Sequence, residues 1–140
     1  MKNQKGTIKE IFACNDIVSN EELFPLQKWY NELINKTEDE ITTADVLRML
    51  RQKKFVELAV SKAIDFLQRD IFEGELFDGE LLETIVAYDK PFLRSYSNIL
   101  RDILMNGLEE NELHEWLDDE ERKDFEAVIK SGLKHLEMAD

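Results

Sequence analysis

Phe55-Val-Glu-Leu-Ala-Val-Ser-Lys-Ala-Ile-Asp-Phe-Leu67 is the most hydrophobic stretch of the 140-residue chain. Nine of its thirteen residues are apolar, and the polar ones, which are separated by four, one and three positions, are Glu57, Ser61, Lys62 and Asp65. On an α-helix with 3.6 residues per turn, this spacing leaves only a narrow polar stripe. Such a helix is stable only when other elements surround it. We therefore expect residues 55–67 to form the central helix of a helical domain.

Segments on both sides of this stretch have the same helical period. Their apolar residues recur every three or four positions, and five glycines and two prolines leave few breaks. The expected helix starts, in chain order, lie near Ile8, Pro25, Thr42 or Thr43, Asp78, Asp89 and Asp118. Gly107 is expected to end the helix that follows Asp89. The sequence predicts an all-α fold, a compact single-domain bundle of six or seven helices over residues 1–140.

The net negative charge of the chain lies entirely in its second half. Residues 1–69 carry 11 basic and 11 acidic residues, whereas residues 70–140 carry 7 basic and 20 acidic residues, a net charge of −13. This asymmetry favours association with a basic partner. It argues against direct binding of nucleic acid, which needs clustered Lys and Arg for phosphate contacts. The one dense basic run, residues 48–54, is expected to be a solvated helix face or to pair with the chain's own carboxylates.

Cysteine usage and the N-terminal residues indicate the compartment. Cys14 is the only cysteine, so no internal disulfide can form. Residues 1–6 contain no apolar stretch long enough for a signal peptide or a membrane span. We expect a cytoplasmic protein without a membrane partner.

Catalytic and metal-binding motifs are absent from the sequence. His114 and His135 lie 21 positions apart, without metal-ligand spacing, and Cys14 has no catalytic signature around it. The chain has no phosphate-binding glycine loop and no nucleophile elbow. We therefore expect neither an enzyme nor a bound cofactor or metal.

A first acidic block, Phe72-Glu-Gly-Glu-Leu-Phe-Asp-Gly-Glu-Leu81, repeats FEGEL as FDGEL between two strong helices. In a structural interpretation, Gly74 adopts a positive φ, Asp78 caps the next helix, and three apolar residues, Phe72, Leu76 and Phe77, fill the core. In a functional interpretation, residues 70–83 face a cationic partner, because they contain six acids and no base. The candidate partner-binding residues here are Glu73, Glu75, Asp78 and Glu80. Calcium is a poor fit, since no register of the segment matches an EF-hand loop.

A second acidic block spans residues 109–126, with ten acids against Arg122 and Lys123. Acids in the first turn of a helix favour its dipole, so the block can also be a solvated helix start. Trp116 lies among these carboxylates, either as a core residue of a short turn or as an exposed interface anchor. The candidate partner-binding residues of this block are Glu112, Glu115, Trp116, Asp119 and Glu120.

Three runs of sequence together are similar to a known family. They are Asp45-Val-Leu-Arg-Met-Leu-Arg-Gln52, then 55–67, then the acidic loop that closes in Asp78-Gly-Glu-Leu-Leu82. The pattern, over residues 43–88, resembles the immunity proteins of bacterial contact-dependent growth inhibition (CDI) systems. Those proteins bind and neutralise the toxic C-terminal domain of a large secreted adhesin, often a nuclease. The resemblance implies a cytoplasmic inhibitor whose partner is a cognate toxin domain, an RNase with a basic surface.

Composition and resemblance together favour a toxin inhibitor that docks an acidic surface over a basic substrate cleft. Two alternatives stay open at the level of sequence. One is an acidic helical interaction or adaptor module with no toxin partner. The other is an acidic mimic of nucleic acid, which would need carboxylates spaced like phosphates along an elongated surface.

Overall fold

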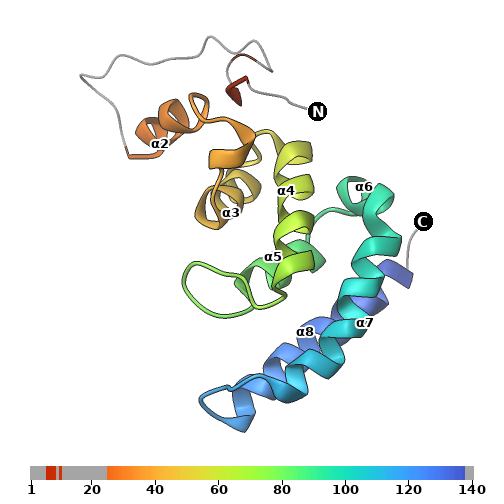
Figure 1. Cartoon of the computed structure of the whole chain (residues 1–140). Helices are drawn as coiled ribbons and strands as arrows, with labels where there is room; N and C mark the ends of the chain where they lie inside the picture. The colour runs from red at the N-terminus through yellow and green to blue at the C-terminus, as the bar shows by residue number, and fades with distance from the viewer. Residues whose placement is uncertain (1–5, 9, 11–24, 138–140) are drawn as a thin grey trace. The chain divides into compact units, whose positions relative to one another are not determined.

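A computed structural model describes residues 6–8, 10 and 25–137, and these residues are helical or form connections between helices (Figure 1). They contain seven α-helices, α2 to α8, and no strand; the β-type pairing among them is a single bridge between Thr7 and Thr37. The all-α prediction is therefore confirmed. Of the three residues on which the first helix was expected, Ile8 is described and helical, whereas Ile11 and Phe12 lie outside the described residues. No helix in the described ranges is both long enough and apolar enough to span a bilayer.

Contacts along the chain divide it into two compact units, residues 1–45 and 46–140. The single domain expected from chain length stays a prediction. In the first unit, α2 (Pro25–Leu33) begins at Pro25 as expected, and the 3-10 helix η2 (Glu38–Glu40) follows. Among the described residues of this unit, the buried apolar ones are Ile8, Leu33, Ile34 and Ile41. The division between the units falls within α3 (Thr43–Gln52).

Asp45 is the buried polar centre of the first unit. Its carboxylate accepts hydrogen bonds from the indole N–H of Trp29 at 3.0 Å and from the ammonium group of Lys36. It also accepts the backbone N–H of Thr42, while the Thr42 hydroxyl accepts the backbone N–H of Asp45, both at 3.1 Å. This reciprocal pair caps α3, as predicted for Thr42. Burial raises the pKa of Asp45, but the bonds from Lys36, Thr42 and Trp29 outweigh it and hold that pKa below its ordinary value.

Acid is expected to destabilise the first unit through Asp45. Because the pKa of Asp45 is lower in the folded state than in the unfolded state, its contribution is present above the unfolded pKa of 3.8 and is lost as pH falls through the folded value. Asp45→Asn should lower the free energy of unfolding at neutral pH by about 2 kcal/mol and remove this acid sensitivity. The indole N–H signal of Trp29, followed by NMR during urea unfolding at pH 7 and pH 3, measures both effects. Asp39→Asn, at an exposed carboxylate of the same unit, is the control; equal losses in the two variants would contradict the prediction.

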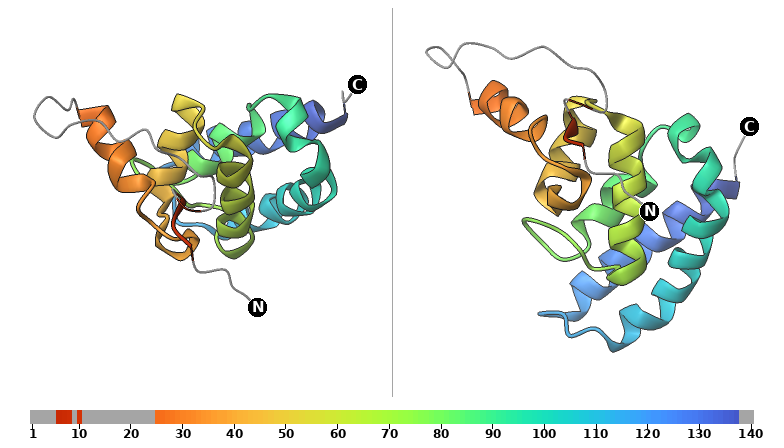
Figure 2. Two further views of the ribbon diagram at one scale, coloured as in Figure 1. Left: turned by 90° about the horizontal axis from the view of Figure 1, so that it is seen from above. Right: turned by 45° about the horizontal axis from the view of Figure 1, so that its top comes forward.

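The second unit is built around α4 (Val56–Arg69), which matches the predicted central helix. Five of its residues are buried: Ala59, Val60, Ala63, Ile64 and Leu67. The helices that follow are α5 (Glu80–Val86), α6 (Lys90–Leu93), the 3-10 helix η3 (Arg94–Tyr96), α7 (Ser97–Leu113) and α8 (Asp119–Glu137). Helices α7 and α8 run antiparallel along each other, and α5 packs against both α4 and α8 (Figures 1 and 2).

Gly107 does not end a helix, contrary to the expectation from sequence. It is buried inside α7, where an added Cβ would lie 2.3 Å from Cδ1 of Ile71 and 3.4 Å from Cδ1 of Ile129. The glycine is thus a point of close packing, and α7 continues to Leu113. The helix expected from Asp89 onward is also interrupted, because η3 separates α6 from α7.

Candidate partner-binding groove

Glu80 determines the shape of the loop that precedes α5. Its carboxylate folds back and accepts the backbone N–H groups of Glu75 and Leu76, each at 2.8 Å. Its side chain is buried, with the residue only 6% exposed. Two backbone bonds close the same loop: the N–H of Gly79 donates to the carbonyl of Phe72, and the N–H of Leu81 to that of Glu73. Glu80 therefore holds the loop in place and does not face solvent.

The two glycines of the FEGEL/FDGEL repeat have different roles. Gly79, with a φ of 88°, is the glycine in the left-handed region and is the N-cap residue of α5, so the roles expected for Gly74 and Asp78 were wrong. Gly74 instead allows a close approach, since an added Cβ would lie 2.1 Å from the carbonyl oxygen of Phe77. Of the three loop apolar residues expected in the core, Leu76 is 78% exposed and Phe77 is 53% exposed, whereas Phe72 is half-buried.

An aromatic cluster joins this loop to the turn between α7 and α8. The ring of Phe72 stacks on the imidazole of His114, with centroids 3.8 Å apart and planes 16° apart. Trp116 meets His114 edge-on at 4.5 Å, and its ring centroid lies 5.4 Å from that of Phe125 on α8. His114 Nε2 also lies 3.0 Å from a carboxylate oxygen of Asp78. Segments 36 positions apart in the sequence are thus connected at one place.

Asn111 and Arg122 fix the turn between α7 and α8. Asn111 is 1% exposed; its side-chain oxygen accepts the indole N–H of Trp116 at 2.8 Å, and its amide donates to the carbonyl of Arg122. The Arg122 guanidinium donates to the carbonyls of Asn111 and His114. Asp118 accepts the N–H of Glu121 at 3.0 Å, which confirms the expected cap of α8. Asn111 therefore holds the indole of Trp116, while Arg122 and Asp118 fix the backbone of the turn that carries it.

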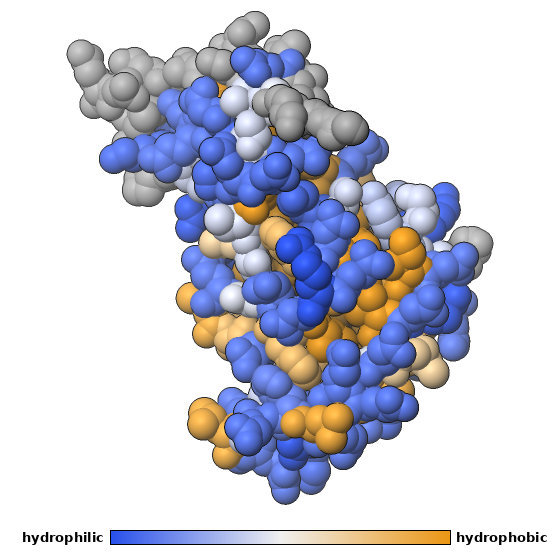
Figure 3. Space-filling model, in the orientation of Figure 1, coloured by the Kyte–Doolittle hydropathy of each residue, from blue (hydrophilic) through white to orange (hydrophobic). Residues whose placement is uncertain are grey.

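The two acidic blocks meet around one groove of about 880 Å³. Its lining, here called the acidic groove, consists of Leu76, Phe77, Asp78, Gly79, Glu83, Glu115, Trp116, Leu117, Glu121, Asp124, Phe125, Ala127 and Val128. Five of these residues are carboxylates and none is Lys, Arg or His. Figure 3 shows apolar residues interrupting a hydrophilic surface at the end of the molecule where α7 turns into α8. Leu117 of this turn is 92% exposed.

The carboxylates of the acidic groove differ in whether they have a hydrogen-bond or ion-pair partner within the chain. Asp78 pairs with His114, and Glu121 accepts the N–H of Leu117 at 2.9 Å. The side chains of Glu83, Glu115 and Asp124 are exposed and make no hydrogen bond or ion pair with any described residue. These three are therefore available to an external cation. Within the described ranges, no group of three or more His, Cys, Asp or Glu side chains is arranged to hold a metal ion.

The residues selected from sequence fall into two groups. Asp78, Glu115 and Trp116 line the acidic groove. The others do not line it: Glu80 is buried, Glu73 is half-buried, Asp119 pairs with Arg122 at 3.2 Å, and Glu75, Glu112 and Glu120 are exposed elsewhere.

Sequence reasoning missed the residues that assemble the groove. His114 was considered only as a metal ligand, and Asn111, Arg122 and Phe125 were not selected at all. Their partners lie up to 53 positions away, as for Phe72 and Phe125, so local spacing contains no signal for them. Glu83 follows the first acidic block, and Glu121 and Asp124 lie in the second. A helical-wheel argument could have placed Glu121 and Asp124, three positions apart, on one face of α8.

Comparison with protein families identifies the chain. The family model of CDI immunity proteins matches residues 10–103, which is about two thirds of the chain. The match includes the loop side of the acidic groove and ends before the α7–α8 turn that forms its other side. No curated protein matches the chain. The extent of the family match shows that the chain belongs to the CDI immunity proteins.

Proposed function

We propose that this immunity protein neutralises a nuclease toxin domain, an RNase, by docking the acidic groove over the basic surface that binds the substrate. The observation that supports the proposal best is the lining of the groove, where two acidic blocks contribute five carboxylates and no basic residue. Nucleases place cationic side chains where phosphates bind, so carboxylates can occupy the same positions. Inhibition by occlusion needs no catalytic residue in the inhibitor.

Exposed apolar side chains beside these carboxylates suit a protein partner. The exposed Phe77 and Leu117 and the half-buried Trp116 all line the groove. Interfaces gain most of their affinity from aromatic anchors that become desolvated at the centre, with charges around them. Free nucleic acid would be repelled by such a surface, whereas a basic protein with an apolar spot would be attracted. The proposal also places the protein in the cytoplasm, where an incoming toxin domain would meet RNA.

Protection is the direct test of the proposed function. The toxin domain would be the C-terminal domain of the adhesin of the same CDI system, expressed with or without this chain. We expect the chain to restore growth, to co-purify with the toxin domain and to abolish RNA cleavage by it in vitro. An intact complex that still cleaves RNA would contradict occlusion, while lack of any complex would contradict the assignment of the partner.

Salt dependence tests the electrostatic part of the proposal. Complementary charges accelerate association by steering, and salt screens them over a Debye length of about 10 Å at 0.1 M. We expect the association rate constant to fall about tenfold or more between roughly 50 and 500 mM NaCl, while the dissociation rate constant changes much less. Stopped-flow fluorescence of Trp116 in the Trp29→Phe background measures both rates. An association rate that is insensitive to salt would exclude the electrostatic mechanism but not the apolar contact.

A further inference from the structure

Trp116 has the largest side chain in the lining of the acidic groove, and contacts within the chain fix it from several sides. Its ring meets His114 edge-on, with centroids 4.5 Å apart, and its centroid lies 5.7 Å from that of Phe72. The ring of Phe125 on α8 lies 5.4 Å away. The indole N–H donates to the side-chain oxygen of Asn111 at 2.8 Å. Trp116 is nevertheless only half-buried, so part of its surface is available to a partner.

Asn111 occupies a core position of α7. The buried residues of this helix follow one another at spacings of three, one, three and four positions, and they are Leu100, Ile103, Leu104, Gly107 and Asn111. This spacing places all five on one face of the helix. Asn111 is the polar member of that face and is only 1% exposed. Because burial of an amide costs free energy unless its donor and acceptor are both hydrogen-bonded, a polar residue is favoured here only if it has specific partners.

The hydrogen bonds of Asn111 serve two different tasks. Its side-chain amide donates to the carbonyl of Arg122 at 3.1 Å, and its backbone carbonyl accepts the Arg122 guanidinium at 3.1 Å, so these two bonds tie α7 to α8. Its side-chain oxygen is directed to the indole of Trp116 instead. An indole N–H only donates and a carbonyl only accepts, so the amide must present its oxygen to the indole and its nitrogen to the carbonyl. A side chain without this acceptor would loosen the indole, while Arg122 would still hold the carbonyls of Asn111 and His114.

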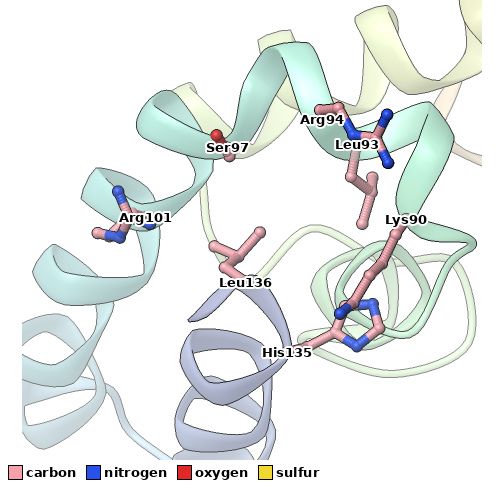
Figure 4. A pocket seen from close by; sticks show the side chains of 7 residues that line it. All are labelled: Lys90, Leu93, Arg94, Ser97, Arg101, His135 and Leu136. Carbon is pink, nitrogen blue, oxygen red and sulfur yellow. The ribbon is translucent and has the colours of Figure 1, made fainter. Parts of the chain in front are cut away.

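A tryptophan that is fixed before binding is a better anchor than a mobile one. A side chain that is immobilised at an interface loses conformational entropy, which costs up to about tenfold in affinity. Tryptophan is also among the residues that most often carry the binding energy of an interface. The pocket at the other end of α8 differs in this respect, because the described residues that line it include Arg94 and Arg101 (Figure 4). Such long side chains lose more entropy when a partner fixes them.

We propose that Trp116 is the main anchor for the toxin domain and that Asn111 is its positioning residue. In this arrangement, Asn111 holds the indole in its binding orientation before the partner arrives, so the entropy of ordering the ring is lost during folding and not during binding. The inference rests on the proposed function of the acidic groove. It adds which residue of the groove contributes most to affinity and which buried residue prepares it.

Asn111→Ala and the matched control Asn106→Ala test the positioning role. Both remove an asparagine amide from α7, but Asn106 is exposed and does not line the groove. In the free chain, we expect the NMR order parameter of the Trp116 indole N–H to fall from about 0.85 to below about 0.6 in Asn111→Ala only. Affinity for the toxin domain, measured by calorimetry, should fall about tenfold in Asn111→Ala and stay within about twofold in Asn106→Ala. Circular dichroism melts show whether both variants are folded.

A double-mutant cycle with Trp116→Phe separates positioning from a merely structural role. The phenyl ring has no N–H for Asn111 to hold, and we expect this change alone to weaken binding about tenfold or more. In the Trp116→Phe background, Asn111→Ala should then cost less than about twofold in affinity. An equal cost in both backgrounds would show that Asn111 acts only through the turn and would overturn the positioning role. A Trp116→Phe variant that binds as tightly as the natural chain would overturn the anchor.

The natural chain provides a test that does not depend on the folding of Asn111→Ala. We expect its Trp116 indole N–H to be as ordered as the helical backbone; Trp116→Phe assigns the signal, because the chain has two tryptophans. A mobile indole in the natural chain would overturn the positioning role. Absence of any complex with the toxin domain would instead contradict the proposed function, and the order parameters of the free chain would still decide whether Asn111 positions the indole.

Discussion

Reversing the charge of Glu83, Glu115 and Asp124 to lysine is expected to weaken binding of the toxin domain by about 100-fold or more. These three carboxylates line the acidic groove, are exposed and have no side-chain partner among the described residues. A close charge pair across an interface couples by about 1.5–7 kcal/mol, and each 1.4 kcal/mol corresponds to tenfold in affinity. Charge reversal removes the attraction of a pair and adds a repulsion of similar size. Even for a single pair with a coupling energy at the low end of this range, the two effects together reach the expected loss of affinity. Calorimetry at fixed ionic strength measures the dissociation constant.

A control variant with the same change in net charge distinguishes a local contact in the groove from a long-range effect of the protein's net charge. Glu57→Lys, Asp65→Lys and Glu109→Lys also exchange three exposed carboxylates of the second unit, none of which lines the groove. Glu57 lies in the first turn of α4 as Glu83 lies in the first turn of α5, so the cost to the helix dipole is similar. We expect the control to lower affinity severalfold at most. Equal losses in the two triple variants would mean that net charge, and not this groove, determines binding.

Much of the fold could be predicted from hydrophobic period alone. The narrow polar stripe of 55–67 correctly indicated α4, and Pro25, Thr42 and Asp118 marked real helix starts. These features are local, because a cap bonds within its own turn and an amphipathic face needs only its own residues. Gly107 is the opposite case. As a sequence signal it resembles a helix end, and only its contact with Ile71 explains why a glycine is required inside α7.

The groove could be predicted only in part, because long-range contacts assemble it. Composition identified both acidic blocks, and three of the candidate partner-binding residues chosen from them, Asp78, Glu115 and Trp116, line the groove. Their role in binding stays a prediction. It could not show that Asp78 reaches His114, or that Glu80 turns inward to bind the loop backbone. In a chain with 31 acids, the identity of a residue does not indicate whether its carboxylate is structural or free. Only burial and hydrogen-bond partners separate Glu80 from Glu83.

Exposed apolar residues were the least predictable part. Leu76 and Phe77 sit between two helices and would be assigned to the core by hydropathy. In the loop that backbone hydrogen bonds close, both side chains are exposed. The proposed partner would account for an exposed phenylalanine at this position, because large exposed apolar side chains beside a groove commonly mark interaction sites.

Gly79→Ala is expected to lower the free energy of unfolding of the second unit by about 2–4 kcal/mol. An alanine in the left-handed region costs about 1–2 kcal/mol, and Gly79 has a φ of 88°. The added Cβ would also lie 2.5 Å from Cε1 of Phe125, whose ring is buried, and overpacking typically costs about 1–3 kcal/mol. Urea unfolding followed by circular dichroism measures the total. Since the loop would have to move, binding of the toxin domain should weaken as well.

A double-mutant cycle with Phe125→Leu separates the two costs. The smaller side chain makes room for the new methyl group but leaves the backbone strain, so Gly79→Ala should cost about 1–2 kcal/mol less in the Phe125→Leu background than in the natural chain. Strict additivity of the two changes would show that the ring does not restrict this position. A Gly79→Ala variant with unchanged stability would contradict the left-handed N-cap itself. If stability falls as expected while toxin binding is unaffected, the loop is a structural element only, and the interface lies on the α7–α8 side of the groove.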